Sequence, residues 1–202
     1  TGFKEWEKIK ERQEKIKKVL GASEDEWRDW KWQLRNRICK IESLKKYFTL
    51  TPKEEKEISL TGSIFRWAVV PYYLSLIDPE NPLDPVRLQS IPSIEEYNDS
   101  SGVLDPMAEE FTSPAPAVTR RYPDRLIINV TNQCASYCRH CQRRRNIGEV
   151  DCQTSREDIA AALQYIIENE EIRDVLLTGG DALMLSDETL DWILTELDNI
   201  PH

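Results

Sequence analysis

The sequence predicts an α/β protein in which a helical region precedes the first strands of a parallel βα sheet. Apolar residues recur at helical spacing in the first part of the chain, whereas short β-branched runs alternate with helical patterns after Pro123. Between these parts, residues 71–117 contain eight of the eleven prolines, which predicts loops and short helices. We therefore expect a helical and Pro-rich wrapping region at 1–117 and a βα region at 118–202.

The first region contains three signals for helices. Apolar spacing predicts a helix over residues 3–20, which Gly21 would end. The run Ser23-Glu-Asp-Glu26 has the form of a capping box and predicts a second helix that continues to Ile38. Thr51-Pro-Lys-Glu54 predicts the start of a third helix, with proline at the first helical position. Most of the six tryptophans lie in this region, where we interpret them as packing anchors between helices.

The second region predicts two strands, each followed by a loop and a helix. Residues 126–130 are a short apolar, β-branched run, and residues 174–177 are a similar one. Thr154-Ser-Arg-Glu157 is expected to cap a helix that ends near residue 168, and Ser186 to start a last helix. Strands connected in this way are parallel, and such sheets bind ligands at the carboxyl ends of their strands. Both intervening loops would lie at that edge.

Three cysteines follow the first of these strands directly. Cys134, Cys138 and Cys141 have the spacing C-x3-C-x2-C within one loop. Three thiolates can hold three irons of a cubane cluster and leave the fourth iron open to a ligand. The alternative is a zinc-binding scaffold, but structural zinc normally takes four ligands, and His140 lies between two of the cysteines. The spacing therefore favours an iron–sulfur cluster and keeps zinc as the alternative.

The composition excludes several classes of protein. A net charge of −9 argues against a dedicated nucleic-acid binder, because phosphate backbones attract clustered Lys and Arg. No apolar run approaches the ~20 residues that span a bilayer, and the first residues do not form a secretory signal. Five cysteines, three of them crowded, indicate metal ligation in a reducing compartment. We expect a cytoplasmic protein without nucleic-acid or membrane partners.

Taken with the cysteine loop, the surrounding sequence resembles the radical S-adenosylmethionine (SAM) superfamily and, within it, the lysine 2,3-aminomutase family. Five stretches carry the resemblance in the family's order: Asp29-Trp-Lys-Trp-Gln33, residues 71–78, Arg121-Tyr-Pro-Asp-Arg125, Cys138-Arg-His-Cys141 and Gly179-Gly-Asp-Ala-Leu183. Residues 142–148 and 106–110 are more similar to the glutamate 2,3-aminomutase branch than to the lysine branch. The resemblance implies an isomerase, and residues 118–202 would form the first two βα units of a radical SAM partial (TIM-like) barrel.

The resemblance also implies roles for the cysteine loop. Cys134, Cys138 and Cys141 would ligate a 4Fe–4S cluster, whose open iron would take the amino and carboxylate groups of SAM. An electron from the cluster would cleave SAM and release a 5′-deoxyadenosyl radical. His140 occupies the position of a residue that lies against the adenine, although a solvated loop histidine is an alternative interpretation.

Further residues match positions that bind the other parts of SAM and the substrate. Gly179, Gly180 and Asp181 match the segment that contacts the methionine amino group, although Gly-Gly-Asp alone is an ordinary βα turn. Arg143 matches the arginine that binds the substrate α-carboxylate, a task suited to the guanidinium fork. For its neighbours Arg144 and Arg145, a solvated basic face without a ligand-binding role is an alternative interpretation.

A second cofactor follows from the same resemblance. Arg121, Tyr122 and Arg125 match positions that bind pyridoxal 5′-phosphate (PLP); from the residues alone they would be a salt-bridge cluster at the strand entry. PLP would carry the amino group while it moves from C2 to C3 of an amino acid. The family's PLP-binding lysine has no counterpart in this sequence, so no catalytic residue is assigned.

Several wider expectations complete the interpretation. The partners would be an amino acid, an electron donor such as flavodoxin or ferredoxin, and further copies in a homo-oligomer. The sequence lacks an initial Met and stops soon after a helical pattern, which predicts the amino-terminal part of a longer protein, inactive by itself. Glutamate is the expected substrate. Lysine remains an alternative, as does a radical SAM enzyme that modifies a translation factor.

Overall fold

The computed structural model describes residues 2–202, with side chains from residue 5 onward. The chain divides into two compact units: Thr1–Ser101 with Ala135–Cys141, and Gly102–Cys134 with Gln142–His202. The mixture of helices and strands confirms the predicted α/β class. None of the described helices is long and apolar enough to cross a membrane.

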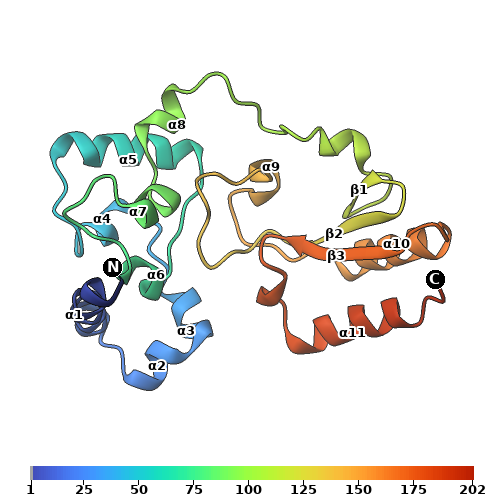
Figure 1. Ribbon diagram of the computed structural model, residues 1–202, viewed down its shortest axis with the longest axis horizontal. Coiled ribbons are helices and arrows are strands. Elements are labelled where there is room, and N and C mark those ends of the chain that lie inside the picture. The colour runs from blue at the N-terminus through green and yellow to red at the C-terminus, as the bar shows by residue number, and fades with distance from the viewer. Residues whose placement is uncertain (1) are drawn as a thin grey trace. The chain divides into compact units, whose positions relative to one another are not determined.

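The first unit is helical. Its elements are α1 (Gly2–Leu20), α2 (Glu24–Arg28), α3 (Trp30–Arg35), α4 (Ile41–Leu44), α5 (Pro52–Ile64), α6 (Pro71–Ser75), α7 (Pro85–Ser90) and α8 (Ile94–Asn98) (Figure 1). Gly21 ends α1 with φ at +67°, as expected of a glycine at a helix carboxyl end. Trp27, Trp32 and Trp67 are buried in one apolar core, which confirms that these tryptophans are packing anchors.

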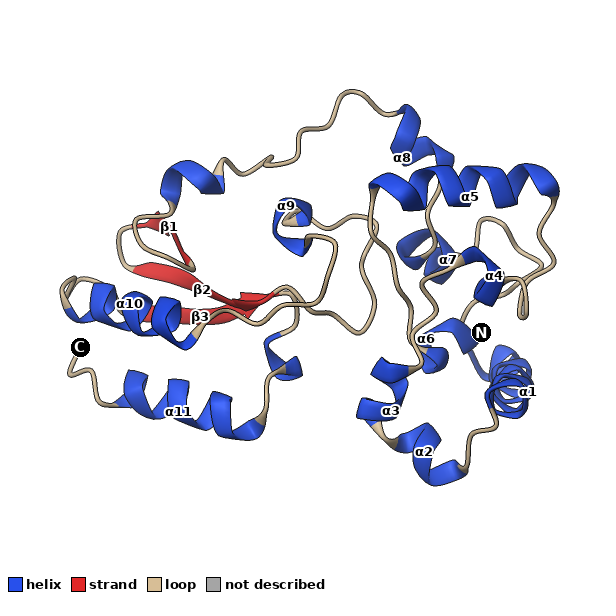
Figure 2. Ribbon diagram, turned by 180° about the vertical axis from the view of Figure 1, so that it is seen from behind, coloured by secondary structure: helices blue, strands red, loops and turns tan. Residues whose placement is uncertain are grey.

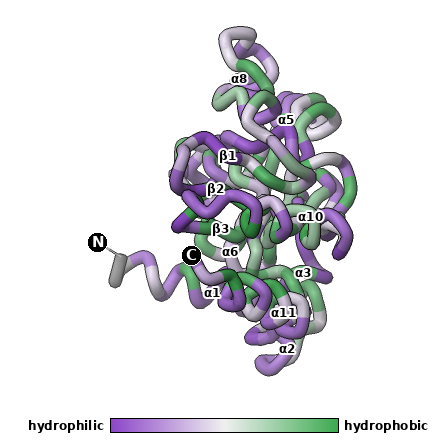
Figure 3. The backbone as a smooth tube through the Cα atoms, turned by 90° about the vertical axis from the view of Figure 1, so that its right-hand side faces the viewer, coloured by the Kyte–Doolittle hydropathy of each residue, from purple (hydrophilic) through white to green (hydrophobic). Residues whose placement is uncertain are grey.

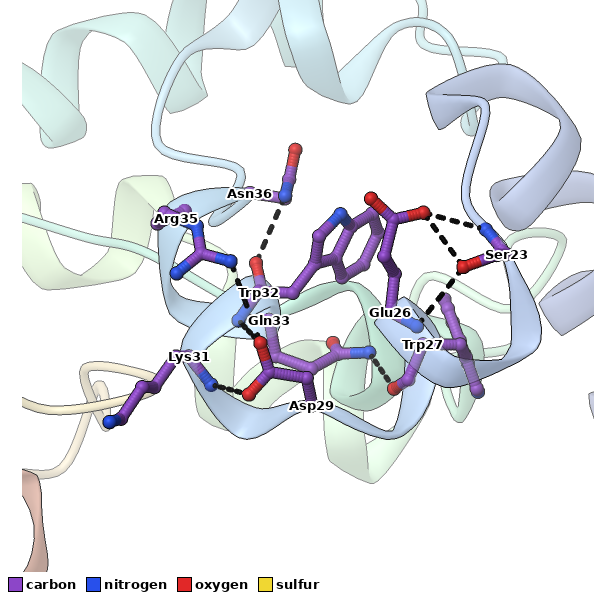
Figure 4. Close-up of polar contacts among 9 residues, drawn as sticks. All are labelled: Ser23, Glu26, Trp27, Asp29, Lys31, Trp32, Gln33, Arg35 and Asn36. Atoms are coloured by element: carbon purple, nitrogen blue, oxygen red, sulfur yellow. Dashed lines mark hydrogen bonds and ion pairs between the residues drawn. The ribbon is translucent and has the colours of Figure 1, made fainter.

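The expected second helix is broken into two, which corrects the prediction of one helix to Ile38. Asp29 takes an extended backbone and ends α2, and its carboxylate accepts hydrogen bonds from the amides of Lys31 and Trp32 to start α3 (Figure 4). An aspartate side chain competes with the helix for backbone amides, which is why it favours a cap over a helix interior. Ile38 lies in a bridge with Val69 rather than in a helix.

The predicted capping boxes at the starts of α2 and α5 are both present. In each, the hydroxyl accepts a hydrogen bond from the third helical residue, whose carboxylate accepts one from the cap amide. Figure 4 shows the first box, between Ser23 and Glu26. The Pro-rich stretch forms short helices and loops, as predicted.

The second unit contains the sheet. Its elements are η1 (Glu109–Thr112), β1 (Val118–Tyr122), β2 (Arg125–Thr131), α9 (Arg144–Ile147), α10 (Arg156–Ile167), β3 (Asp174–Gly179), η2 (Ala182–Met184) and α11 (Asp187–Asp198) (Figure 2). The strand order is β1-β2-β3, with β2 and β3 parallel as predicted. The antiparallel strand β1 was not predicted, because Val-Thr-Arg-Arg-Tyr shows no clear alternation.

The two faces of the sheet differ in polarity. Leu126, Ile128 and Val130 of β2 are buried and pack with apolar residues of α10 and α11. On the opposite face lie Ile127, Asn129 and Thr131 of β2, as their alternation with the core residues requires. Both hydrophobic and hydrophilic segments occur in α11 (Figure 3), and its Ile193 is buried in the same core as β2.

The start of α10 differs by one residue from the predicted cap. Ser155 is the cap, and its hydroxyl accepts a hydrogen bond from the amide of Asp158. Thr154 instead donates its hydroxyl to the carbonyl of Asn129, because its backbone is hydrogen-bonded to Val130 at the edge of β2. Ser186 caps α11 as predicted.

Candidate functional site

The cysteine loop begins where β2 ends, and Asn132 fixes its first residues. The Asn132 amide group donates hydrogen bonds to the carbonyls of Ile147 and Val150, both 2.9 Å away, and its oxygen accepts one from the amide of Cys152 at 2.7 Å. Its backbone amide also donates to the Cys152 carbonyl. One side chain therefore ties the entry of the loop to the segment that follows α9. Sequence reasoning missed it, since a single asparagine carries no spacing signal.

The later part of the loop alternates buried and exposed side chains. Tyr137 and Arg139 are buried, whereas Cys138 and His140 are exposed. The Tyr137 amide donates to the carbonyl of Ala68, and its ring lies beneath the guanidinium of Arg66 at 4.5 Å. The segment turns at Arg139 and His140, and with Tyr137 and Arg139 buried, the Cys138 thiol and the His140 imidazole are left exposed.

Arg139 is held by a bidentate ion pair with Glu96. Its Nε and Nη2 lie 2.9 and 2.8 Å from the two carboxylate oxygens, and Nη1 donates to the carbonyl of Arg66 at 3.0 Å. Both side chains are shielded from water, with exposed fractions of 6% for Arg139 and 15% for Glu96. Glu96 also accepts a hydrogen bond from the Ser93 amide as part of the α8 capping box. The residue between two predicted ligands is thus a structural anchor, a role that its position in the sequence did not reveal.

The three predicted ligands are divided by the chain between the two units, with Cys134 in the second and Cys138 and Cys141 in the first. All five cysteines are outside disulfides. Within the described part of the chain, no three His, Cys, Asp or Glu side chains are grouped as a metal site. The donor chemistry of three thiols suits an iron–sulfur cluster.

Gly179 and Gly180 lie against the backbone of the cysteine loop. Their turn is joined to it by hydrogen bonds from the amides of Gly180 to Thr131 and of Asp181 to Gln133, at 2.5 and 2.8 Å. Gly179 has φ at +124°, and a Cβ on either glycine would overlap backbone atoms of the loop. The glycines are therefore required because two loops approach each other closely at the carboxyl ends of β2 and β3.

Asp181 has a local partner for its side chain. Its carboxylate accepts a hydrogen bond from the amide of Leu183 at 3.1 Å and starts η2. One such bond leaves a carboxylate with further acceptor positions, which suit an ammonium donor. The structure thus contains the turn expected of a βα connection and an acceptor at the edge where the cysteine loop begins.

The arginines after the last cysteine face two carboxylates of the segment before β1. Arg143 Nη2 lies 3.2 Å from Glu109 Oε1, and Arg145 Nε lies 3.3 Å from Asp105 Oδ2. A hydrogen bond from the Glu110 amide, more than the nearby Arg145, lowers the pKa of Asp105 below its usual range. The Nε of Arg143 is buried and has no hydrogen-bond partner in the described structure. A guanidinium with an unsatisfied donor fits a carboxylate ligand.

Arg121, Tyr122 and Arg125 lie at the opposite end of β2 from the cysteine loop. They end β1 and begin β2, about 20 Å from Thr131 at the rise of a strand. The Arg125 guanidinium lies 5.3 Å above the Tyr122 ring and pairs with Asp124. This pairing lowers the pKa of Asp124 and raises that of Arg125. The second unit therefore does not bring this set together with Gly179, Gly180 and Arg143.

A cavity of about 640 Å³ opens at the carboxyl end of β2 within the second unit. Asn129, Thr131, Arg145 and Gly179 are among the residues that line it. The Asn129 side-chain oxygen is buried and has no hydrogen-bond partner in the described part of the chain. The edge that the sequence predicted for ligands therefore contains space and an unused acceptor.

Comparison with known proteins gives named relatives. The chain is 57% identical over 201 residues to glutamate 2,3-aminomutase of Clostridioides difficile, a match that covers 100% of the chain and 48% of the relative. It is 50% identical to L-lysine 2,3-aminomutase of Clostridium subterminale (90% of the chain, 44% of the relative) and 42% identical to that of Bacillus subtilis (98% and 42%). No protein-family model matches the chain. The chain spans about half the length of the curated relatives it matches.

Proposed function

Because the chain is homologous along its length to glutamate and L-lysine 2,3-aminomutases, which are isomerases, we propose that it belongs to a radical SAM 2,3-aminomutase acting on glutamate. The reaction would move the α-amino group of the amino acid to C3. The observation that carries this proposal is the cysteine loop at the carboxyl end of β2, hydrogen-bonded through its first residues to the Gly-Gly-Asp turn of β3. The loop supplies the thiols and the turn supplies backbone groups and a carboxylate.

The residues of this chain would share the work as follows. Cys134, Cys138 and Cys141 would hold the cluster, and Asp181 would accept a hydrogen bond from the amino group of SAM. His140 is exposed and would lie against the adenine. When bound, the 4Fe–4S cluster supplies an electron, SAM supplies the hydrogen-abstracting radical and PLP carries the migrating amino group. The protein binds and orients these groups.

We infer that β2 with α10 and β3 with α11 are the first two βα units of a partial barrel, preceded by the region 1–117. Two adjacent parallel strands with helices packed on one face support this inference. The face with Asn129 and Thr131 would then point into the barrel, where polar side chains can line a site. An electron donor such as flavodoxin or ferredoxin, and a homo-oligomeric state, are part of the same proposal.

The test of the function uses the protein that contains this chain at its natural length. Purified without oxygen, it should contain about four irons per chain and should convert glutamate to 3-aminoglutarate with SAM, PLP and a reductant. Replacing Cys138 with alanine should remove the iron and the turnover together. One tetrahedral zinc per chain would refute the proposal. In a parallel assay with lysine, formation of β-lysine without turnover of glutamate would change the substrate to lysine.

The predicted PLP contacts can be tested separately, since they lie at the other end of β2. Replacing Arg121 and Arg125 with alanine should lower the affinity for PLP about tenfold or more, because two charge-assisted bonds to phosphate are lost. Iron content should not change. The control is Arg173→Ala, which removes an exposed cation beside Asp124 that is not in the predicted set. Equal loss of PLP in the control would contradict the assignment.

A further inference from the structure

Glu109 is a buried carboxylate whose side chain contacts Arg143. The side chain is 2% exposed, and its Oε1 lies 3.2 Å from Arg143 Nη2. Burying a carboxylate without a cation is costly, so the guanidinium is the group that makes this burial tolerable. The arrangement is asymmetric, because the Arg143 side chain is 28% exposed and remains open to a ligand.

The backbone around Glu109 is fixed by its own contacts. The hydroxyls of Thr112 and Ser113 both donate to the Glu109 carbonyl, at 3.2 and 2.8 Å. Ala108, the residue before it, has φ at +50°, a left-handed conformation that costs an alanine about 1 kcal/mol. A strained residue persists where its surroundings over-determine it. The carboxylate is therefore presented from a rigid turn.

A second ion pair holds the same two segments together. Asp105 accepts a hydrogen bond from the Glu110 amide at 3.0 Å, which closes the turn, and it pairs with Arg145. Arg143 and Arg145 thus each contact one carboxylate of residues 105–109. The segment fixes both ends of this short basic run and limits the directions that the Arg143 guanidinium can take.

We propose that Glu109 is a positioning residue for Arg143, which it orients toward the α-carboxylate of the amino acid substrate; this inference rests on the proposed function. The ion pair joins Glu109 Oε1 to the terminal Nη2 of Arg143, and a guanidinium has further N–H donors that suit a carboxylate ligand. The buried Nε of Arg143 has no hydrogen-bond partner in the described structure. Pre-orienting an arginine saves the cost of ordering it when the substrate binds.

The experiment compares Glu109→Gln with Glu110→Gln in the protein that contains this chain at its natural length. Glu110→Gln is the matched control, because Glu110 is exposed and its substitution removes the same charge at the adjacent position. We expect Glu109→Gln to raise KM for the amino acid about tenfold with little change in kcat. This pattern results when a mutation weakens substrate binding equally in the ground state and in the transition state. Glu110→Gln should leave both constants unchanged. A purely structural role would instead lower stability or kcat without raising KM.

Chemical modification of Arg143 tests the ion pair without measuring turnover. The rate at which phenylglyoxal modifies Arg143, located by mass spectrometry, should increase several-fold in Glu109→Gln relative to the exposed Arg173 and remain unchanged in Glu110→Gln. An unchanged rate, or an unchanged or lowered KM, would overturn the positioning role. Absence of any turnover in the unsubstituted enzyme would overturn the proposed function and the inference with it. Turnover with unaltered KM would overturn the inference alone.

Discussion

Replacing Gly179 with alanine is expected to lower the free energy of unfolding by about 3 kcal/mol or more, through steric overlap and backbone strain. An added Cβ would overlap the carbonyl of Thr131, which is backbone and cannot rotate away. The φ of +124° adds a conformation that residues with a side chain avoid. Chemical denaturation of the variant would measure the loss. The variant should also retain less iron, because the displaced backbone is the entry of the cysteine loop.

Gly21 provides the matched control for this substitution. It also has positive φ, at +67°, but nothing lies within 4 Å of the position that its Cβ would take. Gly21→Ala should therefore cost only about 1 kcal/mol, the conformational part of the effect. Equal losses in the two variants would show that the close approach between the Gly-Gly-Asp turn and Thr131 does not contribute.

Removing the carboxylate of Glu96 is expected to destabilise the first unit by about 3–5 kcal/mol, the range observed when one partner of a buried ion pair is lost. Glu96→Leu would leave the Arg139 guanidinium without its bidentate acceptor. Because Arg139 lies between Cys138 and His140, we also expect reduced iron retention. Thermal unfolding and iron analysis of the same preparations would measure both effects.

Two further variants distinguish loss of the Glu96–Arg139 ion pair from nonspecific destabilisation. The double variant Glu96→Leu with Arg139→Leu should recover part of the stability, because apolar residues can replace a buried ion pair at little cost. Glu7→Gln, which breaks the exposed pair with Lys10, should have no measurable effect. Additive losses in the double variant would contradict coupling between Glu96 and Arg139.

Local sequence signals predicted much of the fold. The capping boxes at Ser23 and Thr51, the strand runs at 126–130 and 174–177 and the glycine after α1 each depend on residues close together in the chain. Such signals reflect backbone hydrogen bonding and side-chain periodicity, which are local properties. The errors were local as well. Asp29 interrupted a helix whose apolar spacing continued past it, and β1 lacked alternation.

For the candidate site, the sequence indicated which residue types could act as ligands but not how they are held. The spacing of the cysteines and the resemblance indicated which residues would bind iron, SAM and substrate, and these assignments remain predictions. No local pattern indicated that Asn132, Glu96 or Glu109 support that site. Their partners lie 15–20, 43 and 34 residues away, and no periodic pattern connects such positions.

The starts of α2, α5 and α11 and the parallel pairing of β2 with β3 could be predicted from the sequence, because each depends on residues within a few positions of one another. The pairing of each carboxylate with its arginine, and the contact of Gly179 with the backbone of Thr131, depend on the packing of distant segments. The physical reason is that burial selects these partners. A charge or a carbonyl removed from water needs a counterpart, and packing of distant segments supplies it.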